Sequence, residues 1–181
     1  ASNITTRDAK VATIFRQAKS AGWGLNSEPA RALKLLAQEC VNAGANALEI
    51  NTQQHYDRLE EMQFAVEVVQ QVTSLPVCLS THNSETLEAG LKDCKHPPLV
   101  NYISIDETSL KRMLPLIATY RASVILLVSD PVAPSDAPEM LEKTAILVGA
   151  ANESGIPNDR IFVDPGIIHV TGDNGQRHLV E

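Results

Sequence analysis

A chain of 181 residues is long enough to bury a core of its own without disulfides or bound metal ions. Its 15 Lys and Arg residues stand against 22 Asp and Glu residues, and this net charge of -7 argues against a nucleic-acid or membrane partner, because both need a basic surface. The three cysteines form no C-x-x-C pair, which favours a reducing, cytoplasmic setting, and no apolar run approaches the roughly 18 residues that span a bilayer.

Short apolar runs alternate with longer stretches of helical period along the chain, which predicts βαβ units around a parallel sheet. Residues 1–4 are typical of the end of a strand, and further strands are expected at 47–51, 76–80, 99–104, 124–128 and 160–164. Helices are expected at 8–21, from a Ser27 cap to Gly44, at about 59–72, from an Asn83 or Ser84 cap to about Cys94, after an Asp106 cap, and after the Pro-rich loop 130–138 up to Gly155. The third of these helices has an apolar face predicted to comprise Leu59, Met62, Ala65, Val66, Val69 and Val72.

Polar residues at the ends of these strands distinguish between two α/β architectures that share the alternation. Periodicity alone fits both an open, doubly wound sheet and a closed (β/α)8 barrel. Polar residues, however, lie at or near the C-terminal ends of successive strands, namely Asn51, Ser80, Asn101, Ser129 with Asp130, and Asp164. In a TIM barrel all these ends surround one pocket. We therefore expect an incomplete (β/α)8 TIM barrel with about six strands.

Asn101 and Asp164 are the strongest candidates for binding a ligand. A carboxylate that accepts two parallel N–H bonds and an amide that both donates and accepts match the 2-amino-4-oxo edge of pterins and guanine. The structural alternatives are a turn-forming Asp at a strand end and an Asn whose amide is satisfied by a neighbouring strand. The sequence has no Gly-rich phosphate loop followed by Lys, and its five histidines lack metal-binding spacing, so we expect no metal site.

Four ordered motifs resemble the pterin-binding family. They are Gly-Ala-Asn-Ala-Leu-Glu-Ile-Asn at 44–51, Leu-Glu-Ala-Gly-Leu-Lys at 87–92, Val-Asn-Tyr-Ile-Ser at 100–104 and Val-Asp-Pro-Gly-Ile-Ile at 163–168. Thr171-Gly172 followed by His178 extends the resemblance. Within the family the chain is most similar to the methyltetrahydrofolate:corrinoid methyltransferases, including the folate domain of cobalamin-dependent methionine synthase. The resemblance implies that residues 1–181 are part of a single pterin-binding barrel domain without its last two βα units.

The resemblance also implies roles for particular residues. Asn101 and Asp164 would hydrogen-bond the pterin ring and act in catalysis, and Asn51 and Ser80 would line the same folate site. Ser80 stands where the family usually has a pterin-binding Asp, and Glu49 stands where Asp is common. The implied reaction moves the N5 methyl of methyltetrahydrofolate to the cobalt of a corrinoid, such as cobalamin, that a partner protein supplies. Members of the family often form homodimers.

Two other functions remain open at this stage. Dihydropteroate synthases also carry an Asp-Pro-Gly-Ile segment, but residues 52–55 read Thr-Gln-Gln-His where those enzymes have a Gly-rich loop. A non-catalytic barrel that binds a pterin or a corrinoid protein is the other alternative, and Ser80 is its best support.

Overall fold

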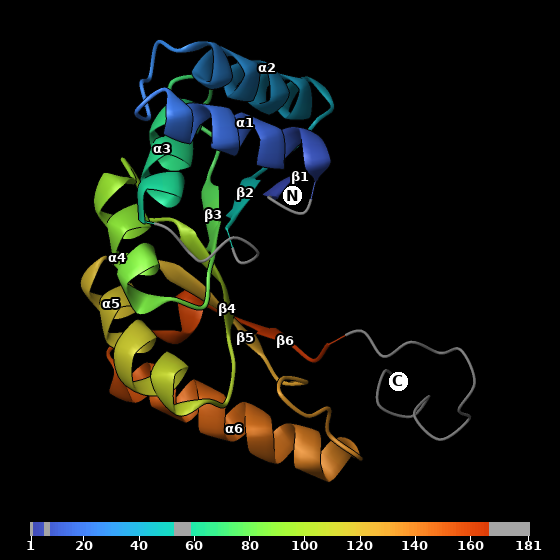
Figure 1. Cartoon of the computed structure of the whole chain (residues 1–181). Coiled ribbons are helices and arrows are strands. Elements are labelled where there is room, and N and C mark those ends of the chain that lie inside the picture. Colours follow the sequence, from blue (N-terminus) through green and yellow to red (C-terminus); the bar gives the residue numbers. More distant parts are fainter. Residues whose placement is uncertain (1, 6–7, 53–58, 167–181) are drawn as a thin grey trace. The chain divides into compact units, whose positions relative to one another are not determined.

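The computed structural model describes residues 2–5, 8–52 and 59–166 (Figure 1). It divides into two compact units, residues 1–101 and residues 102–181. Each unit repeats the predicted alternation of strands and helices. In both units, strands that are neighbours in the sheet are also neighbours in the chain and run parallel.

The first unit contains four strands and four helices among its described residues. In chain order these are β1 (Ser2–Thr5), α1 (Ala9–Ser20), α2 (Glu28–Asn42), β2 (Leu48–Asn51), α3 (Leu59–Val69), β3 (Val77–Ser80), α4 (Ser84–Asp93) and β4 (Leu99–Ile103), whose last two residues belong to the second unit. Strand β1 pairs with β2, β2 with β3, and β3 with β4. A doubly wound sheet reverses its strand order at a switch point, whereas a barrel does not. The order β1 to β4 is that of a barrel.

Three side chains cap helices of the first unit, and two of them, Ser27 and Asn83, were among the predicted caps. Asp8 accepts hydrogen bonds from the backbone N–H groups of the first turn of α1, and Ser27 does the same for α2. Asn83 is the residue that caps α4, since its Oδ1 accepts from two backbone N–H groups of that helix. These bonds satisfy donors that have no partner within the helix, which explains why each helix begins where it does.

Helix α3 differs from its prediction at both ends. Leu59, the first described residue of the helix, is 38% exposed instead of lying on the buried face. At the other end the backbone N–H groups of Gln71 and Val72 bond to the carbonyl oxygens three residues earlier, Val68 and Val69. This tightening of the last turn ends the helix, so Val72 lies in the connection to β3 rather than on the helical face.

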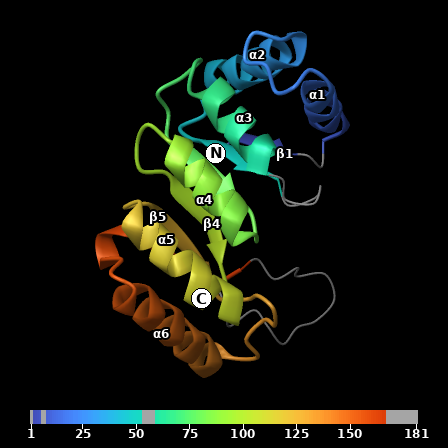
Figure 2. The same cartoon turned by 60° about the vertical axis from the view of Figure 1, so that its left-hand side comes forward.

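Helices α3 and α4 cover one face of β2 and β3 (Figures 1 and 2). Leu48, Ile50 and Leu79 point to this face and are fully buried. Gly90 of α4 makes the close approach possible, because a Cβ there would lie 2.8 Å from Met62 Cγ and 3.1 Å from Leu79 Cδ1. The alternate residues of the strands point to the opposite face.

The second unit continues the chain with one turn of π-helix at Ser109–Met113, α5 (Leu114–Thr119), β5 (Ser123–Leu127), α6 (Ala137–Glu153), a short 3-10 turn at Asn158–Arg160 and β6 (Ile161–Asp164). Asp106 Oδ1 accepts from the backbone N–H of Ser109 at 2.9 Å, as expected of a cap. Helix α6 begins before Pro138 rather than after it, because a proline in the first turn costs no helical hydrogen bond. None of the described helices has the length and apolar character needed to cross a membrane.

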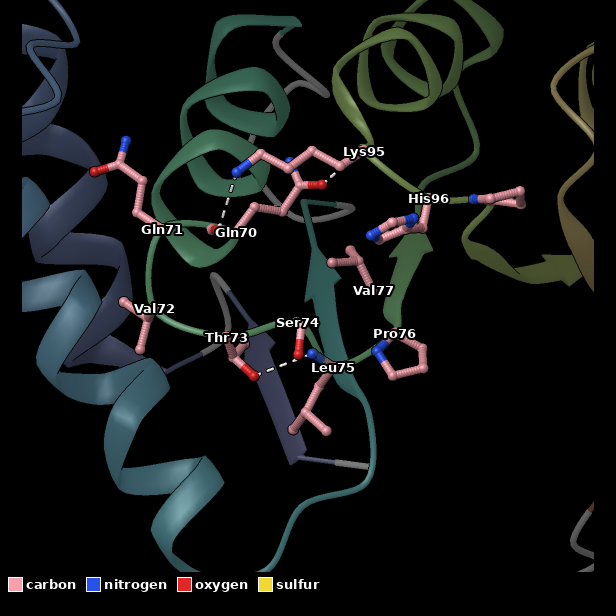
Figure 3. Close-up of a pocket in the computed structure, with 11 residues that line it drawn as sticks. Gln70, Gln71, Val72, Thr73, Ser74, Leu75, Pro76, Val77, Lys95 and His96 are labelled. Atoms are coloured by element: carbon pink, nitrogen blue, oxygen red, sulfur yellow. Dashed lines mark hydrogen bonds between the residues drawn. The ribbon is translucent and has the colours of Figure 1, made fainter.

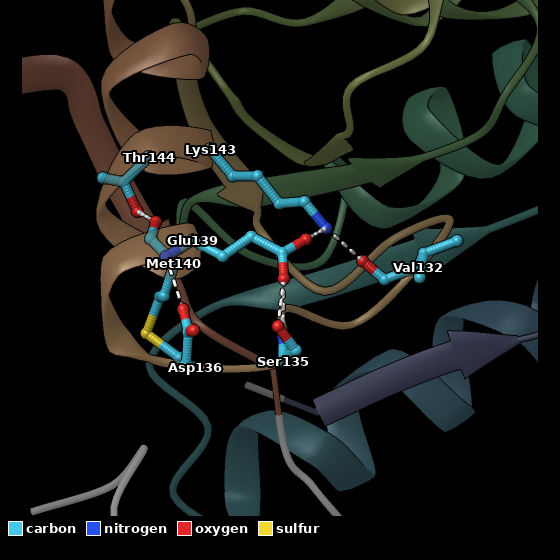
Figure 4. A network of polar contacts seen from close by, with 7 residues as sticks. All are labelled: Val132, Ser135, Asp136, Glu139, Met140, Lys143 and Thr144. Carbon is cyan, nitrogen blue, oxygen red and sulfur yellow. Dashed lines mark hydrogen bonds and ion pairs between the residues drawn. The ribbon is translucent and has the colours of Figure 1, made fainter.

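A polar network joins the start of α6 to the loop before it (Figure 4). Glu139 Oε2 accepts from the hydroxyl and the backbone N–H of Ser135, both at 2.7 Å, while Oε1 lies 2.9 Å from Lys143 Nζ. Lys143 also donates to the carbonyl oxygen of Val132 at 2.9 Å. The hydrogen bonds from Lys143 and Ser135 lower the pKa of Glu139 to about 2. The network fixes this loop to the helix that follows it.

Candidate functional site

The predicted site residues of the first unit, Asn51, Ser80 and Asn101, lie at one level of its sheet. Thr5 of β1 is in register with Asn51 of β2, and Asn51 is in register with Ser80 of β3. Leu79 is in register with Val100, so Asn101 stands level with Ser80 one residue further along. Residues at the same level of parallel strands point to the same face. The C-terminal ends of four strands thus present a row of polar side chains on the face that α3 and α4 do not cover.

Asn101 forms a hydrogen bond that the sequence did not predict. Its Nδ2 donates to Oε1 of Glu49 at 2.9 Å. Glu49 lies two residues before Asn51 in β2 and on the same face, and the bond reaches from β4 across β3 to β2. Both side chains are half-buried. The only local signal was an acidic residue between the apolar residues Leu48 and Ile50.

Cys78 lies in register with Glu49 and on the same face of the sheet. Burial raises the pKa of its thiol to about 12, and the negative charge of Glu49 adds to the effect. A thiol with so high a pKa stays protonated at neutral pH and is a poor nucleophile. The chemistry of this face is therefore hydrogen bonding, and Cys78 is a packing residue. All three cysteines of the chain are free.

Asp164 ends β6 in the second unit, where it is in register with Leu127. Its backbone carbonyl oxygen accepts from the N–H of Val128 at 2.9 Å, and its Oδ1 accepts from the N–H of Gly166 at 2.8 Å. Gly166 has φ 86°, and a Cβ at this position would overlap the side chain of Ser129. The turn thus orients the carboxylate of Asp164, which remains exposed to solvent.

A surface pocket of about 420 Å³ lies at the opposite ends of the strands (Figure 3). It is lined by the residues that connect α3 to β3 and α4 to β4, including Lys95 and His96. The side chain of Gln70 connects these two segments. Its Oε1 accepts from the backbone N–H of Lys95 at 2.6 Å, and its Nε2 donates to the carbonyl oxygen of Asp93 at 2.9 Å. In barrels, active sites occupy the C-terminal ends of the strands, so we assign these contacts to stability.

The histidines form no metal-binding group within the described part of the chain. No three His, Cys, Asp or Glu side chains cluster there in a way that could hold a metal ion. His82 is exposed just after β3, and His96 lines the pocket at the other end of the sheet. His55, His169, His178 and the Thr171-Gly172 pair lie outside the described residues.

A parallel sheet in barrel order, with polar side chains at the C-terminal strand ends, defines an α/β barrel enzyme scaffold. Residues 18–180 match the family described as pterin binding enzyme. The chain belongs to this family, as its four motifs predicted.

The comparison with curated proteins finds a methylcorrinoid:tetrahydrofolate methyltransferase of Eubacterium limosum. It is 26% identical over 119 residues, which cover 64% of this chain and 44% of the relative. The chain therefore aligns with less than half of that enzyme's length.

Two solved structures of dihydropteroate synthase from Xanthomonas albilineans have the same fold. One contains 4-aminobenzoic acid and superposes with a TM-score of 0.64. The other, a complex with indole-2-carboxylic acid and 6-chloroguanine, superposes with a TM-score of 0.63. Each is 19% identical in sequence, and the match covers 91% of this chain and 57% of the synthase. This likeness confirms the predicted α/β barrel fold, and the roles of Asn51, Ser80, Asn101 and Asp164 remain predictions.

Proposed function

We propose that the chain forms the folate-binding part of a methyltransferase that moves the N5 methyl of methyltetrahydrofolate to the cobalt of a corrinoid held by a partner protein. The observation that carries the proposal is the row formed by Asn51, Ser80 and Asn101 at the C-terminal ends of neighbouring strands in a pterin-binding enzyme. The similarity to a methylcorrinoid:tetrahydrofolate methyltransferase supports methyl transfer as the reaction.

Asn101 and Asp164 are proposed to bind the pterin ring. The carboxylate of Asp164 suits two parallel N–H donors, such as an amino group and the adjacent ring N–H of a 2-amino-4-oxo pyrimidine. The amide of Asn101 adds a further contact, and Asn51 and Ser80 supply neutral polar groups beside it. Ser80 provides one hydroxyl where a carboxylate would add a charge-assisted bond worth about 1.5–3 kcal/mol. We therefore expect folate to bind less tightly than it would with Asp at this position.

In the proposed reaction the methyl carbon bonds to cobalt(I) as its bond to N5 breaks. The electron pair of the broken bond stays on N5, which takes up a proton, so the products are a methylated corrinoid and tetrahydrofolate. The protein forms no covalent bond in this scheme. Its residues hold the pterin in line with the cobalt and stabilise the change of charge at N5.

Transfer in the opposite direction is a second candidate. The relative from Eubacterium limosum is named for transfer from a methylcorrinoid to tetrahydrofolate. A catalyst lowers the same barrier in both directions, so the same residues would serve. The direction then depends on whether the partner delivers its corrinoid as cobalt(I) or already methylated.

The test uses the complete gene product with methyltetrahydrofolate and cobalt(I) cobalamin. Loss of the visible absorbance of cobalt(I) at a rate that depends on the protein supports the proposal, and methylcobalamin with tetrahydrofolate tests the other direction. Formation of dihydropteroate from a pterin pyrophosphate and p-aminobenzoate would instead identify a dihydropteroate synthase. Folate binding without either reaction would identify a non-catalytic barrel.

A further inference from the structure

We propose that Glu49 is a positioning residue that fixes the amide of Asn101, so that the amide's carbonyl oxygen rather than its NH2 group is presented to the ligand. This inference rests on the proposed folate site. It adds Glu49 to that site and identifies the hydrogen-bonding group that Asn101 offers to the ligand.

The hydrogen bond between the two side chains determines the orientation of the amide. An asparagine amide can turn over and exchange its oxygen and nitrogen at little cost when nothing nearby distinguishes them. Glu49 does distinguish them, because an ionised carboxylate only accepts hydrogen bonds. Asn101 Nδ2 donates to Glu49 Oε1 at 2.9 Å, and the turned amide would bring two oxygens together instead. Asn101 Oδ1 is therefore directed away from Glu49.

The surroundings of Glu49 make it a stable reference for this contact. Its neighbours Leu48 and Ile50 are fully buried under the helices, which fixes the strand on which Glu49 stands. The ion pairs among the described residues join lysines to Glu88, Glu107 and Glu139, and none involves Glu49. Its carboxylate is thus directed to the Asn101 amide instead of to a cation.

The fixed amide selects for one kind of ligand group. A carbonyl oxygen accepts, so the ligand must present an N–H to Asn101. The ring and exocyclic N–H groups of a reduced pterin meet this requirement. An analogue with a ring nitrogen acceptor at the contacting position would face a carbonyl oxygen and bind poorly.

The test is a double-mutant cycle on folate affinity in the complete gene product. The variants are Glu49→Leu, which removes the acceptor, Asn101→Ala, and the double variant. Glu49→Leu is expected to raise the dissociation constant of methyltetrahydrofolate about tenfold or more in the wild-type background. Because Glu49 acts through Asn101, the same change is expected to have little effect once Asn101 is alanine. An equal loss in both backgrounds would show that Glu49 acts independently, and the inference would be wrong.

Two further variants separate positioning from general damage. Glu49→Gln keeps an oxygen that can accept from Asn101, so its dissociation constant is expected within about threefold of wild type. Glu39→Leu makes the same change of charge at an exposed position of α2 and is expected to leave affinity unchanged. Failure of Glu49→Gln to restore binding would contradict the role as an acceptor.

A measurement without ligand distinguishes failure of this inference from failure of the proposed function. The side-chain NH2 signals of Asn101 in a ¹⁵N NMR spectrum are identified by their absence in Asn101→Ala. The chemical shifts of these signals are expected to change strongly in Glu49→Leu and little in Glu49→Gln. If they move as expected while the wild-type protein binds no folate, the folate proposal fails and the orientation by Glu49 stands. If Glu49→Leu leaves them unchanged, the inference fails even if folate binds.

Discussion

The backbone N–H of Gly166 donates a 2.8 Å hydrogen bond to Oδ1 of Asp164, across the proline between them. This contact uses one oxygen of the carboxylate and depends on the positive φ of Gly166. An asparagine at position 164 has an oxygen that can make the same bond. The turn and the proposed ligand contact can therefore be separated by a single substitution.

Asp164→Asn is expected to weaken folate binding by about tenfold or more, because a charged acceptor of two N–H bonds becomes an amide that accepts with one oxygen only. The free energy of unfolding is expected to change by less than about 1 kcal/mol, since the bond from Gly166 persists. Titration with methyltetrahydrofolate and thermal denaturation measure the two effects. Asp159→Asn, at an exposed position of the same unit, is the control. Equal losses of binding and stability would refute the assignment.

Gly90→Ala is expected to lower stability by about 1 kcal/mol. The added Cβ would lie 2.8 Å from Met62 Cγ in the contact between α3 and α4, and such overpacking costs about 1–3 kcal/mol, partly offset by the better helix propensity of alanine. Gly149→Ala on α6 is the matched control, because a Cβ there has no neighbour within 4 Å. Urea denaturation is expected to show a loss for the first variant and a small gain for the second. A gain at both positions would contradict the close approach of the helices.

Much of the fold follows from local signals. Ser27 and Asn83 are residue types whose side chains accept hydrogen bonds from helix N-termini; Ser27 caps the helix that it was predicted to cap, and of the two candidates Asn83 and Ser84 it is Asn83 that caps α4. Asn51 and Ser80 lie side by side in neighbouring strands, as their positions at the ends of apolar runs indicate. Such features need no knowledge of the tertiary structure.

The features that escaped prediction depend on contacts between distant residues. The bond between Glu49 and Asn101 joins positions 52 apart in sequence, and it exists only because of the register of three strands. The turn of π-helix at Ser109–Met113 was also not predicted, because the apolar pattern of these residues is typical of an ordinary α-helix. Sequence patterns identify which residues are polar at a strand end, while the register decides which of them meet.

The stability of the start of α6 is expected to depend on pH in the acid range. The pKa of Glu139 is lowered from 4.5 to about 2 by its bonds to Lys143 and Ser135. A lowered carboxyl pKa contributes stability that is fully present above about pH 4.5 and is lost as the pH falls towards 2. Glu139→Gln is expected to flatten this part of the stability profile, measured by circular dichroism melts from pH 2 to 6. Glu142→Gln, an exposed position on the same helix, makes the same charge change, and an equal flattening there would refute the network's role.

Ser80→Asp tests how far the proposed folate site departs from the pattern that its family usually has. The substitution adds a carboxylate at a position that is only 2% exposed, so the unliganded protein is expected to lose about 1–3 kcal/mol of stability. If Ser80 faces the pterin, the new charge-assisted hydrogen bond is expected to tighten folate binding about tenfold or more. Calorimetric titration with methyltetrahydrofolate measures the gain, and Ser80→Asn, similar in size but uncharged, controls for the added volume. Unchanged binding by both variants would remove Ser80 from the proposed site, whereas tighter binding by Ser80→Asp alone would mean that the serine limits the affinity of the chain for folate.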